Sequence, residues 1–197
     1  QLNTNILQIE NEFYSNIRPK RTTGPCERPI TALAERGIQY IEVRCLDIDP
    51  NQAIGISAET ARFVDAFLLF CALQESPPFA DNGWCSESAA NFAKVVKLGR
   101  QPALTLTKLG KEVSLSQWAD QLMDDIALCA QTLDRALGEN KYVNAVISQR
   151  AKVADPSKTP SAQFLSQLSA RKASFHDFVL EQSLGHAQRL KDAGLSP

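Results

Sequence analysis

The stretch GIQYIEVRCLDIDP, residues 37–50, decides the fold. Apolar and polar side chains alternate over Ile38–Ile48, and a repeat of two residues is typical of a β-strand with one buried face. Pro50 ends this strand, because proline has no N–H to donate to a neighbouring strand. Residues 2–14 show the same alternation. The sequence therefore predicts two strands near its beginning.

The segment between the two predicted strands, RPKRTTGPCERP at residues 18–29, is rich in proline, glycine and positive charge. Such a composition is typical of a loop. We therefore expect residues 18–29 to connect the strands, followed by a short helical turn at residues 30–34.

Beyond the second strand, apolar residues recur at three- and four-residue steps, which is the period of a helix. Ser57 is a suitable N-cap for a helix over residues 59–74, which is apolar nearly all round and is expected to be buried between layers. A longer helix is expected from Ser114 or Ser116 to Gly138, because glycine favours the left-handed conformation that ends a helix. The shorter predicted helices cover residues 86–98 and 142–153 and begin after Thr159 and after Ser174.

Strands followed by helices indicate an α+β protein. A two-stranded sheet is marginally stable by itself in water, so the remaining strands of an antiparallel sheet are expected from a part of the protein outside this chain or from another chain. We predict two domains, with strands of the sheet at residues 1–50 and a mainly helical region that packs on the sheet at residues 51–197.

The composition argues against several classes of function. The 197 residues include 21 Lys and Arg against 22 Asp and Glu, with a pI of about 6.2, which argues against nucleic acid or an anionic membrane as a partner. The longest apolar run, residues 63–73, contains Asp65 and is shorter than the roughly 20 residues that cross a bilayer. The five cysteines show no Cys-x-x-Cys spacing, so we expect free, mostly buried thiols in a reducing cytoplasm.

Residues suited to chemistry share one face of the second strand. By the alternation of side chains, Tyr40, Glu42 and Arg44 lie on one face, while alternate residues over Ile41–Cys45 form an apolar face that fits against helices. A carboxylate beside a guanidinium can hold a metal ion and an anionic substrate group side by side. An ion pair that only covers the edge of the sheet is the alternative.

The first strand shows a similar pattern, because Gln8, Glu10, Glu12 and Tyr14 share a face. Two carboxylates two residues apart repel each other, and divalent cations between them would offset this repulsion. A solvated polar face explains the pattern equally well.

Three cations lie close together at Arg18, Lys20 and Arg21. Arginine can clamp phosphate oxygens with two parallel hydrogen bonds, although a charged surface loop is the alternative. Neither the G-x-x-x-x-G-K-[ST] phosphate loop nor the G-x-G-x-x-G dinucleotide motif occurs in the sequence. A nucleotide would therefore be held by a sheet surface with metal ions and arginines.

Two blocks and their spacing carry a resemblance to a known family. QLNTNILQIENEFYSNIRPKR at residues 1–21, followed by GIQYIEVRCLDIDP at 37–50, resembles the C-terminal part of proteobacterial glutamate–cysteine ligase, also called γ-glutamylcysteine synthetase. The resemblance continues more loosely through RFVDAFLLFCALQESP at 62–77. The family enzyme is more than twice the length of this chain, and its N-terminal half, with most of the other metal-binding acids, is absent here.

This resemblance implies a fold and an activity. The family has a glutamine-synthetase-like antiparallel sheet curved into a funnel, which binds ATP and Mg²⁺ (or Mn²⁺) at one end and amino acids at the other. ATP phosphorylates the γ-carboxylate of L-glutamate, and the amine of L-cysteine then attacks the acyl phosphate. This reaction is the first step of glutathione biosynthesis. Because the N-terminal half is absent, we expect this chain alone to be inactive.

The resemblance also assigns roles to residues. It implies that Glu42 is a metal ligand, with Glu10 or Glu12 as a further possible one, that Arg44 faces the glutamate and its transferring phosphoryl group, and that Tyr14 lines the cysteine pocket. It implies further that a basic segment near the ATP phosphates is formed by Arg18, Lys20 and Arg21.

A second function fits the helical part of the sequence. The chain could be a non-catalytic helical interaction or regulatory module that kept the strands as a scaffold. The residues Glu42 and Arg44, present jointly with the basic segment Arg18–Arg21, favour the ligase. A non-catalytic module has no reason to keep an acid and bases that face a common cleft.

Overall fold

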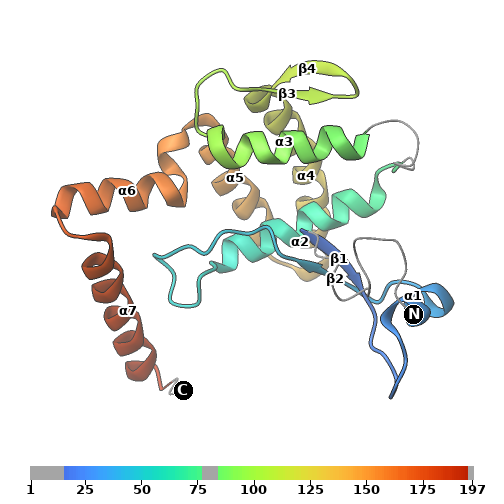
Figure 1. Cartoon of the computed structure of the whole chain (residues 1–197), viewed down its shortest axis with the longest axis horizontal. Coiled ribbons are helices and arrows are strands. Elements are labelled where there is room, and N and C mark those ends of the chain that lie inside the picture. Colours follow the sequence, from blue (N-terminus) through green and yellow to red (C-terminus); the bar gives the residue numbers. More distant parts are fainter. Residues whose placement is uncertain (1–15, 77–83, 195–197) are drawn as a thin grey trace, which may run out of the picture. The chain divides into compact units, whose positions relative to one another are not determined.

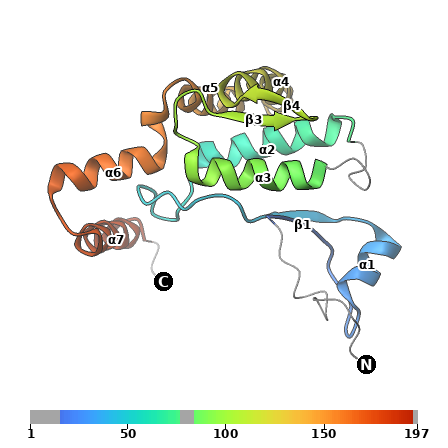
Figure 2. The same ribbon diagram turned by 45° about the horizontal axis from the view of Figure 1, so that its top comes forward.

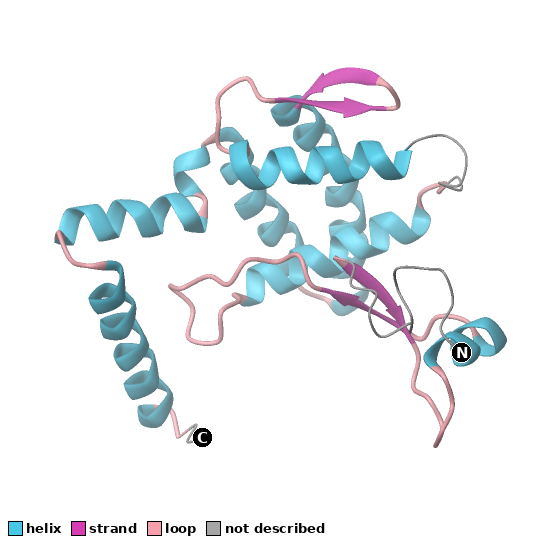
Figure 3. Cartoon of the chain, in the orientation of Figure 1, coloured by secondary structure: helices cyan, strands magenta, loops and turns pink. Residues whose placement is uncertain are grey.

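The computed structural model describes residues 16–76 and 84–194. Within these ranges the chain has seven α-helices and two small antiparallel sheets, so the predicted α+β class, mainly helical after the strands, is confirmed (Figures 1 and 3). The chain divides into two compact units between Ile48 and Asp49. We refer to them as the strand unit and the helical unit and describe each by itself.

The strand unit contains a two-stranded antiparallel sheet and one helix. Strand β1 (Ile17–Lys20) pairs with strand β2 (Tyr40–Val43), and helix α1 (Pro29–Arg36) lies between them in the sequence. The N–H of Arg44 donates to the carbonyl oxygen of Asn16 at 2.8 Å, which extends the pairing beyond β2. The strand predicted over residues 38–48 is therefore shorter than expected, and the helical turn predicted at residues 30–34 is a full helix.

The prediction that residues 18–29 only connect the strands is wrong at its beginning, because β1 includes Arg18, Pro19 and Lys20. Hydrogen-bonded and non-hydrogen-bonded pairs alternate in an antiparallel ladder. Since the pair at Arg44 is hydrogen-bonded, the pair of Pro19 with Ile41 falls at a position whose N–H would point away from β2. Proline therefore does not interrupt this ladder. The predicted strand over residues 2–14 lies outside the described residues.

Three helices form the core of the helical unit: α2 (Ala58–Leu73), α4 (Leu115–Leu137) and α5 (Lys141–Ala154). The buried residues of this core are Ala66, Phe70, Met123, Ile126, Cys129, Ala130 and Val146. On α4 they recur at three- and four-residue steps, so one face of this helix packs in the core, as its helical period predicts. Helix α2 is less buried than predicted, because only Ala66 and Phe70 on it are buried.

The hairpin of β3 (Thr105–Lys108) and β4 (Lys111–Ser114) was not predicted, and it packs on α3 (Trp84–Leu98) (Figure 2). Its two turn residues, Leu109 and Gly110, both have positive φ angles, of 53° and 74°. The carboxylate of Glu87 on α3 accepts the N–H groups of both turn residues, at 2.9 and 2.8 Å. This contact holds a left-handed conformation that leucine seldom adopts by itself.

The predicted helix ends are confirmed where side chains cap them. The hydroxyls of Ser57, Thr159 and Ser174 accept backbone N–H groups at the start of α2, of α6 (Pro160–Arg171) and of α7 (Phe175–Asp192). Gly138 ends α4 in the left-handed conformation, with a φ angle of 69°. A short 3-10 helix, η2 (Pro156–Lys158), joins α5 to α6.

The last two helices are tied together by aromatic contacts. Phe178 on α7 is fully buried, and its ring meets the ring of Phe164 on α6 edge to face, with centroids 5.2 Å apart.

His186, further along α7, makes two hydrogen bonds. Its Nε2 lies 2.9 Å from the carbonyl oxygen of Pro50, and its Nδ1 lies 2.6 Å from a guanidinium nitrogen of Arg189. A carbonyl oxygen only accepts, so Nε2 carries the proton and Nδ1 is the acceptor.

The five cysteines are free thiols, but only Cys129 is buried. The expectation of mostly buried thiols is wrong for the other four, which lie on exposed positions of the two units. Although Cys71 on α2 is an exposed residue, partial desolvation of its thiol raises the pKa of that group. Among the described helices, none has the length and apolar character that a bilayer crossing requires.

Asp134 of α4 is a buried carboxylate that the sequence did not single out. Its two oxygens accept the N–H groups of Tyr142 and Val143, each at 2.9 Å, in the first turn of α5. Asn140, at the N-cap position of α5, makes no side-chain capping bond. A residue of one core helix therefore caps the next one.

We expect Asp134→Ala to lower the free energy of unfolding by about 2 kcal/mol, because it leaves two N–H groups of α5 without their acceptor. Chemical denaturation followed by far-ultraviolet circular dichroism measures the change. The matched control is Asp125→Ala, which removes an exposed carboxylate from the same helix and should change stability by less than about 0.5 kcal/mol. Equal effects of the two substitutions would contradict the capping role.

Candidate functional site

One face of the β1–β2 pair carries charged side chains. In the register, Arg18 lies opposite Glu42 and Lys20 lies opposite Tyr40, and residues directly opposite each other project from the same face. Arg44 follows Glu42 by two residues and continues this face. We call these five residues the charged face. Tyr40, Glu42 and Arg44 share this face, as the alternation of side chains in the sequence predicted.

Glu42 lies between two cations. Its Oε1 accepts a hydrogen bond from Nε of Arg44 at 2.7 Å, and its Oε2 lies 3.1 Å from Nζ of Lys20. The hydrogen bond from Arg44, followed by the one from Lys20, lowers the pKa of the Glu42 carboxyl below its usual value. The carboxylate is therefore ionised at neutral pH, and its side chain is 34% exposed.

A metal ion on this face would find one carboxylate there. Among residues 16–76 and 84–194, no group of three His, Cys, Asp or Glu side chains is placed to hold a metal ion. Mg²⁺ is commonly bound by one or two carboxylates together with substrate phosphates and water. The ionised, partly exposed Glu42 fits the role of one such ligand.

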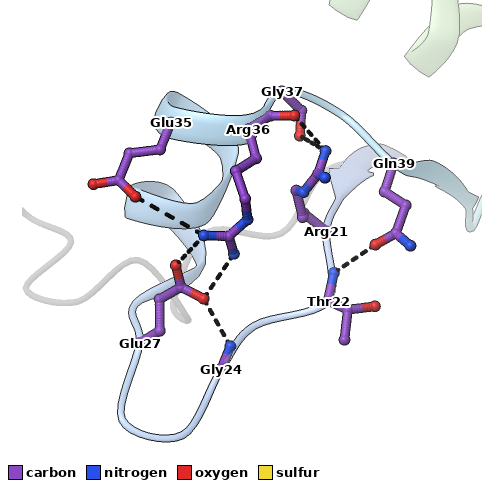
Figure 4. A network of polar contacts seen from close by, with 8 residues as sticks. All are labelled: Arg21, Thr22, Gly24, Glu27, Glu35, Arg36, Gly37 and Gln39. Carbon is purple, nitrogen blue, oxygen red and sulfur yellow. Dashed lines mark hydrogen bonds and ion pairs between the residues drawn. The ribbon is translucent and has the colours of Figure 1, made fainter.

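Arg21 is engaged at a different place from the charged face. Its Nη1 donates to the carbonyl oxygens of Arg36 and Gly37, the latter at 3.1 Å, where α1 ends (Figure 4). These carbonyl oxygens have no acceptor role within the helix, and a cation near a helix C-terminus is favourable. Of the predicted basic segment, the structure places Arg18 and Lys20 on the charged face and Arg21 at the end of α1.

Sequence reasoning missed the network that holds this loop. Arg36 donates from Nη1 and Nη2 to the two carboxylate oxygens of Glu27, at 2.7 and 2.8 Å, and the N–H of Gly24 donates to Glu27 at 2.7 Å (Figure 4). The hydrogen bonds from Arg36 and then from Gly24 lower the pKa of Glu27 to about 2. A loop residue and a helix residue nine positions apart form no periodic pattern, so the sequence offered no signal for this pair.

Three of the predicted site residues, Glu10, Glu12 and Tyr14, lie outside the described residues. The metal-ligand role of either glutamate and the substrate role of Tyr14 therefore stay predictions.

Comparison with known proteins relates the chain to one enzyme family. The family model for glutamate-cysteine ligase matches residues 1–95, which include the whole charged face. The chain is 61% identical over 191 residues to a glutamate–cysteine ligase of Bordetella parapertussis, a match that covers 97% of this chain and 36% of the relative. It is 54% identical to one of Azotobacter vinelandii, with the same coverage.

The chain is therefore related to the C-terminal part of the glutamate–cysteine ligases. It spans little more than a third of the length of these curated relatives.

Solved structures agree with this relationship. Glutamate–cysteine ligase of Francisella tularensis, solved in complex with AMP, matches all of this chain and 38% of its own, with a TM-score of 0.84 and 38% identity. A bifunctional glutathione synthetase of Pasteurella multocida matches 92% of this chain with a TM-score of 0.60 and 20% identity, which supports the fold alone. The resemblance read from the sequence is confirmed, and it extends along the helices, where the sequence motifs did not reach.

We expect the Glu27 carboxyl to titrate with a midpoint of about 2, and Arg36→Gln to raise that midpoint toward 4.5. A depressed carboxyl pKa stabilises the folded state above pH 4.5, and this contribution is lost as the pH falls from 4.5 toward 2. Carboxyl ¹³C NMR of the Glu27 side chain measures the midpoint. Arg28→Gln serves as control, since it removes a neighbouring charge outside this pair and should leave the midpoint low. A midpoint near 4.5 in the unmodified chain would show that the Glu27–Arg36 contact does not persist in solution.

Proposed function

We propose that this chain works as the C-terminal part of a glutamate–cysteine ligase, which joins the γ-carboxyl of L-glutamate to the amine of L-cysteine with consumption of ATP, the first step of glutathione biosynthesis. The observation that carries the proposal is the placement of Lys20, Glu42 and Arg44 together on one face, in a chain 61% identical to a ligase of this name. The complex of the Francisella relative with AMP supports the use of an adenine nucleotide.

The charged face suits a reaction that transfers negative charge. In the first step, a γ-carboxylate oxygen of glutamate attacks the γ-phosphorus of ATP, the bond to the bridging oxygen breaks, and ADP leaves. Arg44 presents a planar guanidinium that can hold two oxygens of a carboxylate or phosphoryl group, while Lys20 acts as a point charge. Together they offset the charge that spreads over the transferred group.

The second step requires orientation more than charge. The cysteine amine attacks the acyl carbon, phosphate leaves, and the nitrogen loses a proton. Holding the amine against the acyl phosphate makes this step effectively intramolecular. We propose that Tyr14 lines the cysteine pocket, and that Arg18 and Lys20, with Arg21 nearby in the sequence, contribute to binding of the ATP phosphates.

We propose that Glu42 contributes one oxygen ligand to Mg²⁺ or Mn²⁺, with Glu10 or Glu12 as a further ligand. A bound divalent ion would supply charge stabilisation to the ATP phosphates. Binding of the ion would compete with Lys20 and Arg44 for the Glu42 oxygens. We also propose that the enzyme works in the cytoplasm, where its five free thiols would stay reduced.

In the complete ligase that contains this chain, Glu42→Gln and Arg44→Lys should each lower kcat by about 10²–10³. The first change removes the charge that a divalent cation needs, so activity should recover only in part at high Mg²⁺. The second keeps the charge but loses the planar fork. Steady-state kcat and KM for glutamate, cysteine and ATP measure both effects.

The matched control is Glu181→Gln, which breaks an exposed 2.7 Å ion pair with Arg171 in the helical unit. It should leave kcat unchanged, and the melting temperatures of all three variants should stay close to that of the unmodified enzyme. Near-normal rates for both site variants would mean that Glu42 and Arg44 form a structural ion pair, and the proposed site would be wrong.

We expect the isolated 197-residue chain to produce no γ-glutamylcysteine from ATP, glutamate, cysteine and Mg²⁺. The chain covers about 36% of the length of its relatives, and among its described residues no group of three His, Cys, Asp or Glu side chains is placed to hold a metal ion. Coupled detection of ADP, with the complete ligase as a positive control, measures turnover. Sustained turnover by the pure chain would contradict this expectation.

A further inference from the structure

The helical unit contains a pocket of about 550 Å³ that is distinct in residues from the charged face. It is lined by α4, by α5 and by the connection from α3 to β3, and Phe63 of α2 contributes to its wall. A volume of this size is within the range of pockets that hold small ligands.

The walls of this pocket are largely apolar. Leu104 and Met123 are buried, and Leu115 and Val153 also belong to the apolar lining. A wholly polar ligand has no apolar surface to bury against these side chains, so it would gain nothing from the hydrophobic effect. The lining therefore favours a ligand with an apolar body.

The charges at the pocket are of one sign. Lys152 and Arg100 line it, and among the described residues neither an aspartate nor a glutamate does, although acids slightly outnumber bases in the whole chain. Lys152 is half-buried, and its Nζ donates to Oε1 of Gln149 at 3.0 Å, which uses one of its three N–H donors. An ammonium group that borders an apolar pocket is stabilised by an anion.

The start of α4 also brings partial positive charge to the pocket. Leu115 and Ser116, the first two residues of α4, also line the pocket. The N-terminal turn of a helix carries partial positive charge, which adds to the effect of Lys152. The remaining polar lining, such as Gln149 and Thr159, is uncharged.

We propose that this pocket binds a small organic anion with an apolar body, such as an aliphatic or aromatic carboxylate, sulfonate or phosphate. Lys152 holds the anionic group, and Phe63, Met123 and Val153 cover the apolar body. The site is additional to the proposed reaction, because glutamate, cysteine and ATP are assigned to the charged face of the strand unit.

The test uses the 197-residue chain and 8-anilinonaphthalene-1-sulfonate, an apolar anion, as probe. Isothermal titration calorimetry and fluorescence should give a single saturable site. Lys152→Gln should weaken binding at least about tenfold, because it removes a charge-assisted hydrogen bond, whereas Lys152→Arg should retain most of the affinity. N-phenyl-1-naphthylamine, which is similar in shape but uncharged, should bind the unmodified chain and Lys152→Gln equally.

The matched control is Lys158→Gln on η2, which makes the same change of charge outside the lining of the pocket. It should leave the affinity for the anionic probe unchanged. Ala119→Phe, which fills the pocket from α4, should abolish binding, and far-ultraviolet circular dichroism reports whether this variant folds. If it does not fold, the comparison of Lys152→Gln with Lys158→Gln still decides.

A second apolar pocket, lined by Phe92 and Trp118 near the hairpin, offers the probe another place to bind. Phe92→Ala tests this possibility. The proposal is overturned if Phe92→Ala weakens binding while Lys152→Gln does not, or if Lys152→Gln and Lys158→Gln have equal effects.

Discussion

The antiparallel pairing of β1 with β2 is the constraint on which the charged face depends. Lys20 and Glu42 are far apart in the sequence, and only this register brings Nζ of Lys20 to within 3.1 Å of the carboxylate. A slip of one residue would turn one strand over and leave Glu42 among apolar side chains. The alternation also explains why Pro19 is tolerated, since its missing N–H would point away from β2.

A tight turn does not set this register, because the strands are joined through a loop and α1 rather than a short hairpin. The loop is held instead by side chains that contact backbone and each other. Arg21 donates to the last carbonyl oxygens of α1, and Arg36 grips Glu27 with two hydrogen bonds (Figure 4). Arg21 directly follows β1, so its contacts contribute to fixing the end of the strand at which Lys20 stands.

The sequence predicted what depends on local patterns. Capping by Ser57 and the end of α4 at Gly138 follow from the chemistry of helix ends, and both are confirmed. The hairpin was missed because its turn places Leu109 where asparagine or glycine is usual, and Glu87 on another element compensates. The cap that Asp134 provides for α5 is likewise a tertiary contact. At the candidate site, the parity of β2 could be predicted, but the contribution of β1 required the register.

The weakness of the ion pairs on the charged face is part of what makes it suitable for a substrate. Exposed ion pairs contribute about 0–1 kcal/mol, because water and salt screen them. Glu42 and its two partners are each about one-third exposed, so in the proposed reaction the exchange of either Glu42 contact for one with a phosphate or carboxylate oxygen would cost little. A fully buried triad would resist this exchange, since each uncompensated charge would then be costly. In the proposed reaction, the Glu42 carboxylate would hold Lys20 and Arg44 in position until an anionic substrate group replaces it as their partner.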